Sequence, residues 1–392
     1  MQSQAGLLLG NTLPRGRVLV LTAAAVLLAA ADWLPENRFV DPDRLEFVIT
    51  LALALTAIGI VARERIGAVR LTGWRNRLLL LTFTLALLLP VMEYATRIIF
   101  SDVTTSSDFG GYFSRNWIRT ADAQVNSAGF RERNFTDATA PGTYRIAVVG
   151  DSFTYGNGIR REDRYSDLLQ AQLPAHCEVL NFGQPGANTP EHLRNVAMLL
   201  PRIHPDFILV QWYVNDTEDD DSAHRPTFHP LIPIRSLHQW LSNASAFYTV
   251  ANMQWAETQV LAGLTMSYQE YLKQRLADPN SPDSRLDRAL LNQLVALSKR
   301  AGVPLGIVLF PDTAASLGTD YPFGYLHERV LDVCTEQGLT CLDLRKDFSM
   351  VKQRRELWAN RLDHHPSARA NAIAAERILE TYSRTWVASP AR

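Results

Sequence analysis

One stretch decides the fold class of this chain: Tyr144-Arg-Ile-Ala-Val-Val-Gly-Asp-Ser-Phe-Thr-Tyr-Gly156. Its apolar run, Ile146–Val149, has the length of a short buried strand and stops abruptly at Gly150-Asp151-Ser152. A turn at the end of such a strand places a hydroxyl at the carboxyl edge of a sheet, where open α/β sheets carry their chemistry. The pattern therefore makes Ser152 the first candidate nucleophile.

Downstream of Ser152 the chain alternates between strand and helix patterns. Short strands that alternate with helices predict a parallel sheet covered by helices on both faces. A helical, aromatic-rich stretch at about residues 224–300 interrupts this order and is predicted to be an insertion. Thr189 and Pro190 begin one of the helices, with Thr189 as its cap. The further strands are predicted at residues 179–180, 207–212, 305–310 and 340–344. Helices are predicted at residues 165–173, 325–337 and 368–382, and one more begins at residue 189.

The composition excludes several classes of protein. The 392 residues carry a net charge of −1, so electrostatics gives no reason to expect a nucleic-acid partner. Three cysteines are too few for a disulfide scaffold. Cys334 and Cys341 are close enough in sequence to pair if the domain is extracytoplasmic, and are otherwise two buried thiols. No group of residues has a distinctive metal-ligand spacing, and we expect neither a metal nor a cofactor.

Three uncharged apolar runs occupy the N-terminal part of the chain: Val18–Ala31, Phe47–Ala62 and Leu78–Met92. Each is shorter than the roughly 20 residues that span a bilayer comfortably, so the flanking charges decide the interpretation. Arginines precede the first run and crowd the loop between the second and third, whereas the loop between the first and second also carries acidic residues. Because positive charge marks the cytoplasmic side, the N-terminus is predicted inside and everything after about residue 95 outside.

These patterns predict a membrane anchor at residues 1–99 in a bacterial inner membrane, a polar linker at 100–125 and a catalytic domain at 126–385. Two alternatives stay open from the sequence. The first run can be a cleaved signal peptide, since small residues stand near its end. If only two runs cross, the catalytic domain falls on the cytoplasmic side. The three transmembrane helices are predicted at about 18–34, 45–62 and 78–95.

A free serine hydroxyl is a poor nucleophile, so Ser152 needs a base and an orienting acid. The segment Arg361-Leu-Asp-His-His-Pro366, just before the last predicted helix, offers both groups. We take His365 as the base and Asp363 as its partner, and His364 is the rival base. No arrangement of carboxylates in the sequence singles out any of five other histidines, namely His176, His192, His204, His238 and His327.

An acyl-transfer site also needs donors aimed at the developing oxyanion. The backbone N–H of Ser152 is one candidate. Gly186 is the second, because it has no side chain and allows close approach of its backbone, although Gly183 can serve instead. Asn215, which follows the strand at 207–212, offers a side-chain NH₂ as the third.

The chain resembles the SGNH (GDSL-type) hydrolases over roughly residues 120–385. The family's Ser, Gly, Asn and His are matched in order by Ser152, Gly186, Asn215 and His365, with Asp363 as the acid. The resemblance implies a flavodoxin-like three-layer α/β/α fold with a parallel sheet and a Ser–His–Asp triad. The segment Asn126-Ser-Ala-Gly-Phe-Arg131 also looks like the short motif that precedes this domain in membrane-associated members.

The chain departs from the family's pattern at two places. The family usually spaces its Asp three residues before the His, whereas Asp363 stands two before His365. The residue two before the Asn is usually Gly, and here it is Tyr213. A tyrosine at that position either narrows the pocket or replaces a close backbone approach, which favours a small acyl group.

These features together predict a membrane-anchored serine esterase of the cell envelope that forms an acyl-enzyme on Ser152. A domain tethered to the lipid bilayer favours ester-bearing envelope substrates, either O-acetylated glycans or lipid-linked sugars. Two alternatives use the same scaffold. One is an O-acyltransferase that passes the acyl group to a sugar hydroxyl, and the other is a non-catalytic polysaccharide-binding domain.

Overall fold

The computed structural model describes residues 74–106, 111–120, 123–218 and 226–388, so the first two predicted membrane segments lie outside the described residues. The chain divides into two units. The smaller unit comprises residues 1–101 and 244–248, and the larger comprises residues 102–243 and 249–392.

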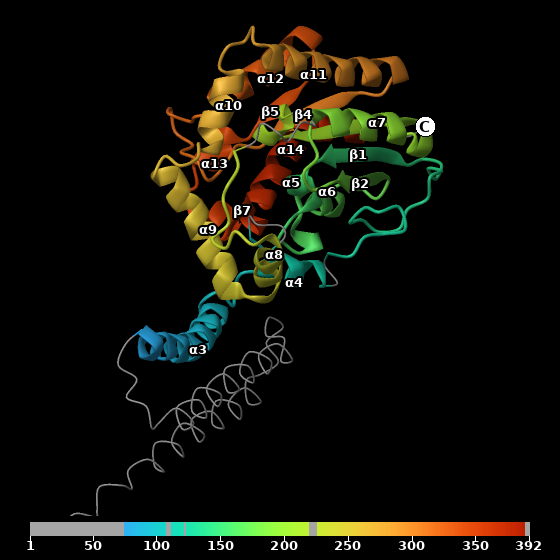
Figure 1. Ribbon diagram of the computed structural model, residues 1–392. Coiled ribbons are helices and arrows are strands. Elements are labelled where there is room, and N and C mark those ends of the chain that lie inside the picture. The colour runs from blue at the N-terminus through green and yellow to red at the C-terminus, as the bar shows by residue number, and fades with distance from the viewer. Residues whose placement is uncertain (1–73, 107–110, 121–122, 219–225, 389–392) are drawn as a thin grey trace, which may run out of the picture. The chain divides into compact units, whose positions relative to one another are not determined.

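Five parallel strands form the central sheet of the larger unit, in the order β2-β1-β3-β4-β5 (Figure 1). This is the flavodoxin-like order, in which the sheet grows in opposite directions on either side of the β1–β3 pair. The predicted parallel α/β fold is therefore confirmed. The strands are β1 (Tyr144–Gly150), β2 (Cys177–Gly183), β3 (Phe207–Trp212), β4 (Leu305–Leu309) and β5 (Cys341–Asp343).

Alternate side chains of β1 enter two different cores, one on each face of the sheet. Ala147 and Val149 pack with helices α7, α11 and α12, whereas Ile146 and Val148 pack with α6, α13 and α14. This division arises because successive side chains of a strand point to opposite faces of the sheet. Strand β1 is buried along its whole length because helices cover both faces (Figure 1). The helices are α6 (Tyr165–Gln172), α7 (Thr189–Ile203), α11 (Pro282–Ala301), α12 (Gly324–Gln337), α13 (Arg345–Ser349) and α14 (Ala368–Ala388).

The predicted insertion at 224–300 is only in part an insertion, and its predicted C-terminal boundary was wrong. Helix α11 supplies the crossover between β3 and β4 that a parallel strand pair requires. Its Leu291 and Leu294 lie in the same core as α7 and β3. The helices that do depart from the alternating pattern are α8 (Arg235–Ala244), α9 (Ala246–Leu261) and α10 (Tyr268–Leu276).

The predicted linker at 100–125 is folded in its described parts, which corrects the linker prediction. It contains helix α4 (Tyr112–Ile118), whose Tyr112, Phe113 and Trp117 are buried. Burial of these three aromatic side chains outweighs the polar composition on which the linker prediction rested. Thr105, in the same segment, is also fully buried.

The described part of the smaller unit consists of helix α3 (Trp74–Ile99) and residues 244–248. Buried Glu93 pairs with Arg97 at 2.7 Å and accepts hydrogen bonds from the backbone N–H groups of Ala246 and Phe247. Helix α3 contains the third predicted membrane segment, 78–95. Within the part of the chain that the structure describes, no helix has both the length and the apolar character for a membrane crossing.

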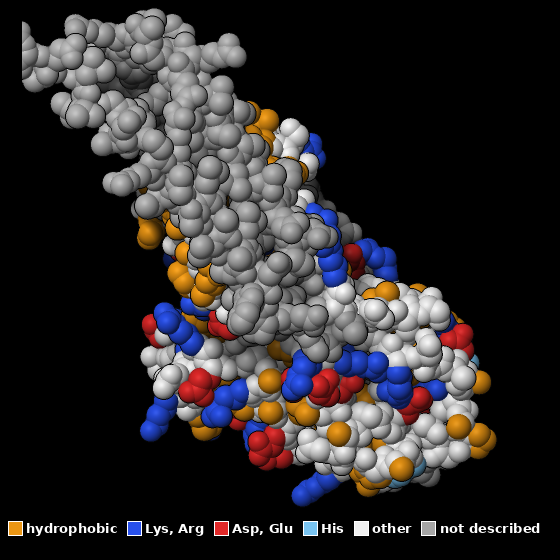
Figure 2. Space-filling view, turned by 90° about the horizontal axis from the view of Figure 1, so that it is seen from below, with side chains coloured by type: hydrophobic (Ala, Val, Ile, Leu, Met, Phe, Trp, Pro, Cys, Tyr) orange, Lys and Arg blue, Asp and Glu red, His pale blue; other side chains and the backbone are white. Residues whose placement is uncertain are grey.

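Acidic and basic side chains intermix on the surface. Figure 2 shows a face on which Lys and Arg side chains lie next to Asp and Glu side chains instead of gathering in a patch of one sign. Where side chains are visible in Figure 2, the mixture agrees with the net charge of −1.

Candidate active site

Ser152 begins α5 (Ser152–Tyr155), a single helical turn directly after β1. Asp151 caps this turn, since its carboxylate accepts a hydrogen bond from the Phe153 N–H at 2.8 Å. Glycine at position 150 makes the turn possible, because a Cβ there would overlap the side chain of Thr154. The local sequence therefore holds Ser152 at the carboxyl edge of the sheet, as predicted.

The structure brings Ser152 and His365 together from distant parts of the sequence. Ser152 Oγ lies 2.8 Å from His365 Nε2, and His365 Nδ1 is hydrogen-bonded to Asp363 Oδ1. A carboxylate only accepts hydrogen bonds, so Nδ1 carries the ring proton and Nε2 is free to accept one from Ser152. The three side chains thus form the hydrogen-bonded chain that an acyl-transfer triad uses.

The unusual spacing of acid and base follows from a short antiparallel hairpin before α14, made of β6 (Trp358–Asn360) and β7 (Asp363–Pro366). Residues two apart in a strand point to the same side, so Asp363 and His365 share one side of β7. The His365 N–H also donates to Asp363 Oδ1, at 3.1 Å. A spacing of two therefore places the acid beside the base in this chain.

His364, the rival base, points away from Ser152. Its position between Asp363 and His365 in β7 directs it to the opposite side of the strand. Its ring packs on Trp358, with the ring centroids 4.3 Å apart. The geometry therefore favours His365 over His364.

Burial and charge act against each other at the triad. Burial alone would raise the pKa of Asp363, but the charge and hydrogen bonds of His365 and the hydroxyl of Thr105 bring that pKa below its usual value. Burial alone would lower the pKa of His365, but the charge and hydrogen bond of Asp363 and the farther charge of Asp151 bring it above its usual value. The site therefore stabilises a carboxylate beside an imidazolium, the charge pair that forms when the serine proton is transferred.

The candidate oxyanion donors follow the ends of three neighbouring strands, β2, β1 and β3. Gly183 ends β2, and its N–H already donates to Asn181 Oδ1 at 2.9 Å. A Cβ at Gly183 would also overlap the backbone of Tyr155, so this glycine serves close packing. Gly186 is exposed in the following turn, with φ of +79° and open space around its Cα. Of the two glycines, Gly186 has the backbone that a substrate can approach.

Asn215 lies in the 3₁₀ turn Val214–Thr217, directly after β3. Its Oδ1 is buried and lacks a hydrogen-bond partner among the described residues. The turn is tied down by Asp216, whose carboxylate accepts the Tyr213 N–H and bonds His192 Nε2, each at 3.0 Å. These bonds hold the backbone of the turn from which the Asn215 side chain projects.

Asn188, and not Thr189, caps α7, so the predicted cap was one residue out. The Asn188 side chain accepts from the Glu191 N–H, and the Glu191 carboxylate accepts from the Asn188 N–H, which makes a capping box. Thr189 instead donates its hydroxyl to the Asp216 carbonyl at 2.9 Å. This bond joins the loop that carries Gly186 to the turn that carries Asn215.

Aromatic rings line one side of the site. Tyr213 packs on Phe153 with ring centroids 4.3 Å apart, and Phe153 meets the His365 ring edge-on at 5.4 Å. Tyr213, which replaces the family's usual glycine, therefore contacts the base His365 through a single intervening ring, that of Phe153.

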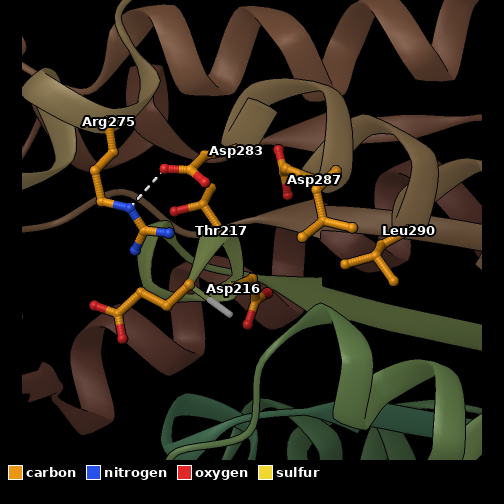
Figure 3. A pocket seen from close by; sticks show the side chains of 8 residues that line it. Asp216, Thr217, Arg275, Asp283, Asp287 and Leu290 are labelled. Carbon is orange, nitrogen blue, oxygen red and sulfur yellow. Dashed lines mark hydrogen bonds and ion pairs between the residues drawn. The ribbon is translucent and has the colours of Figure 1, made fainter. Parts of the chain in front are cut away.

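A separate pocket lies beside the Asn215 turn and includes neither Ser152 nor His365. The Arg275–Asp283 ion pair, at 2.7 Å, forms part of its lining (Figure 3). Burial, together with repulsion from Asp216, raises the pKa of Asp287 in this pocket to about 7. Among the described residues, no three His, Cys, Asp or Glu side chains are placed together to hold a metal ion. Its lining residues are Asp216, Thr217, Glu218, Arg275, Asp283, Leu286, Asp287 and Leu290.

Two other buried histidines have acidic partners that the sequence did not reveal. His192 bonds Asp216 at 3.0 Å, and His327 bonds Asp343 at 3.1 Å. Neither histidine bonds Ser152, so they support the fold around the site. The partners are far apart in sequence and meet only because α7 and α12 pack against the sheet.

Cys334 and Cys341, whose pairing the sequence left open, form a disulfide with a Cα–Cα separation of 6.2 Å. The bond joins the last turns of α12 to the start of β5. Cys177 is a buried free thiol.

Residues 148–373, more than half of the chain, match the GDSL-like lipase/acylhydrolase family. This region contains all five predicted site residues. No curated protein matches the sequence of this chain.

Similar solved structures include a member of the lipolytic G-D-S-L family from Veillonella parvula, with 14% identity over 62% of this chain and 100% of that chain, and a TM-score of 0.39. The esterase EstA from Pseudoalteromonas has 15% identity over 62% of this chain and 99% of its own, with a TM-score of 0.37. The acetyl xylan esterase AlAXEase has 13% identity over 60% of this chain and 98% of its own, with a TM-score of 0.39.

Proposed function

Because the chain belongs to the GDSL-like lipase/acylhydrolase family and is an ester-hydrolysing serine enzyme, we propose that Ser152, His365 and Asp363 are its catalytic triad. The observation that carries this proposal is the 2.8 Å contact between Ser152 Oγ and His365 Nε2. Ser152 Oγ attacks the ester carbonyl carbon while its proton passes to His365 Nε2. Asp363 stabilises the imidazolium that forms.

The negative charge that develops on the carbonyl oxygen is stabilised by donors at the strand ends. We assign this role to the N–H of Ser152, the backbone of Gly186 and the side-chain NH₂ of Asn215. His365 then returns its proton to the leaving alkoxide, and the acyl group stays on Ser152. Water attacks the acyl-enzyme with His365 as base, which releases the acid and restores the serine.

The substrate proposed here is a small-acyl ester on a cell-envelope glycan or a lipid-linked sugar. The aromatic side of the site, formed by Tyr213 and Phe153, supports a short acyl group.

Anchoring of residues 1–99 in a lipid bilayer, with the catalytic domain outside the cytoplasm, is part of the same proposal. The arginine-flanked apolar runs of the sequence support it. The Cys334–Cys341 disulfide supports an oxidising compartment. Alkaline extraction of membranes tests the anchor: we expect the full-length chain to stay in the pellet, and its release would contradict anchoring.

The triad is tested with the full-length chain, purified in detergent, and p-nitrophenyl acetate. We expect Ser152→Ala to lose about 10⁴-fold or more in turnover while its melting temperature stays near wild type. A fluorophosphonate probe should label the wild type at Ser152 and leave the variant unlabelled. Equal hydrolysis by a folded Ser152→Ala variant would refute the mechanism.

Product analysis distinguishes hydrolysis from transfer. With an O-acetylated glycan as donor, we expect free acetate as the product. If a second sugar becomes acylated and no acetate appears, the enzyme is a transferase that uses the same triad.

A further inference from the structure

Asp363 has a second hydrogen-bond partner that lies outside the triad. Its Oδ1 faces His365, whereas its Oδ2 accepts a hydrogen bond from the hydroxyl of Thr105. Both side chains are fully buried, so neither group can turn to bulk water instead. Thr105 precedes the family-matched region, which begins at residue 148.

Thr105 is held in place by contacts on either side of it. We call residues 102–106 the strap. Asn360 Nδ2 donates to the Thr105 carbonyl at 3.0 Å, and the Thr104 hydroxyl donates to the Gly158 carbonyl at 2.8 Å. At the start of the strap, Asp102 pairs with Arg361 at 2.7 Å. The strap is therefore fixed both to the hairpin that carries Asp363 and to the loop after α5.

Gly158 makes room for this arrangement. It has φ of +78°, in the left-handed region that favours glycine. A Cβ at this position would overlap Thr105 Oγ1 and would also lie 3.5 Å from Asp363 Oδ2. The loop after the nucleophile thus leaves space for a hydroxyl to reach the triad acid.

We propose that Thr105 is a positioning residue of the active site, which orients the carboxylate of Asp363 through its hydroxyl and so keeps His365 aligned with Ser152. This inference rests on the proposed function, because Thr105 acts only through the triad. The strap lies in the larger unit and precedes the family-matched region, so a residue from outside that region supplies a part of the catalytic hydrogen-bond chain.

The hydroxyl has two effects on Asp363. It fills the Oδ2 acceptor site, and a buried carboxylate without that donor either rotates or binds a proton more readily. It also fixes the plane of the carboxylate, which leaves Oδ1 directed at His365 Nδ1. A hydrogen bond to a buried charge has the strength to change a rate by about tenfold to a hundredfold.

The decisive test compares variants of the full-length chain in detergent. Thr105→Val removes the hydroxyl and keeps the branched shape, and Thr105→Ser keeps the hydroxyl. For Thr105→Val we expect kcat for p-nitrophenyl acetate and the rate of fluorophosphonate labelling to fall about tenfold to a hundredfold, with KM changed by less than about twofold. Thr105→Ser should restore both rates to within about threefold of wild type.

Thr104→Val is the matched control, because it removes a neighbouring strap hydroxyl that bonds Gly158 and not Asp363. It should keep near wild-type labelling. In an Asp363→Asn background, Thr105→Val should cause no further loss, as a double-mutant cycle requires if Thr105 acts through Asp363.

The possible outcomes distinguish failure of the role proposed for Thr105 from failure of the proposed triad. Wild-type rates for a folded Thr105→Val variant, or equal losses for Thr104→Val and Thr105→Val, would overturn the role of Thr105 and leave the triad intact. If Thr105→Val does not fold, Thr105→Ala removes the same hydroxyl without adding a methyl group against Asp363, and the same comparison holds. Activity or labelling of Ser152→Ala would instead overturn the proposed function.

Discussion

Replacing Asp363 by Asn tests the electrostatic part of the mechanism, because it removes the charge and nearly preserves the shape. The Asp363 carboxylate accepts hydrogen bonds from the His365 N–H, from His365 Nδ1 and from Thr105. An amide can keep its oxygen towards His365 and turn its NH₂ to the Thr105 oxygen, so the fold should survive. In the opposite orientation the NH₂ faces Nδ1, and the ring must then carry its proton on Nε2, where it cannot accept one from Ser152.

The expected loss for Asp363→Asn is about 10⁴-fold in kcat, the cost of the wrong tautomer and of an unpaired imidazolium in such a triad. The pH profile should move as well. Activity rises with pH as His365 loses its proton, and the charge of Asp363 holds the pKa of His365 above its usual value. Without that charge, the residual activity of the variant should reach its plateau at lower pH than in the wild type.

The assay is hydrolysis of p-nitrophenyl acetate between about pH 5 and pH 9, with the melting temperature measured alongside. Asp343→Asn is the matched control, since it neutralises the acid that pairs with buried His327 at 3.1 Å, a His–Asp pair that does not bond Ser152. The control should keep its turnover even if it loses stability. A folded Asp363→Asn variant with wild-type kcat and an unmoved acid limb would refute the role given to this carboxylate.

Three further changes have definite expected results. Asn215→Ala should lower kcat by about 10²–10³ with little change in KM, and an unchanged kcat would remove Asn215 from the oxyanion site. Because the pKa of Asp287 is raised to about 7, folding binds a proton there, and the free energy of unfolding falls as pH rises from about 4 to 7. Asp287→Asn should flatten this pH dependence and raise the melting temperature at alkaline pH. An unaltered pH dependence would contradict the reasoning. Cys334→Ser should lower the free energy of unfolding by about 2–3 kcal/mol in a denaturant titration, and a reductant should destabilise the wild type but not this variant.

The sequence predicted the central sheet well because its strands are buried on both faces. Residues 207–212 were predicted as a strand from an uninterrupted apolar run, and β3 has those bounds. The nucleophile turn was equally clear, since Gly150 is required by the close approach of Thr154. Buried strands and tight turns can be recognised from local sequence, as an apolar run and a glycine at the turn. These two features located Ser152.

The sequence could not predict what depends on distant contacts. The linker prediction failed because the burial of α4 is decided by residues far along the chain, such as Thr249, whose hydroxyl accepts the Tyr112 N–H at 3.3 Å. The predicted C-terminal end of the insertion was wrong because α11, like α9 and α10, has a helical sequence. Only the packing of α11 on α7 shows that it is one of the helices that cover the sheet. The sequence did favour His365 over His364 as the base, and the alternation of side chains along β7 supplies the geometric reason for that choice.

The contact between Thr105 and Asp363 shows why the family-matched region alone gives an incomplete account of this site. Residues 148–373 include the nucleophile, the base and the acid, but one oxygen of that acid faces a residue from before the region. A buried carboxylate cannot leave an acceptor site empty without cost, so the arrangement of the triad depends on where the strap lies. In this proposal the alignment of the triad therefore depends on a residue that precedes the family-matched region.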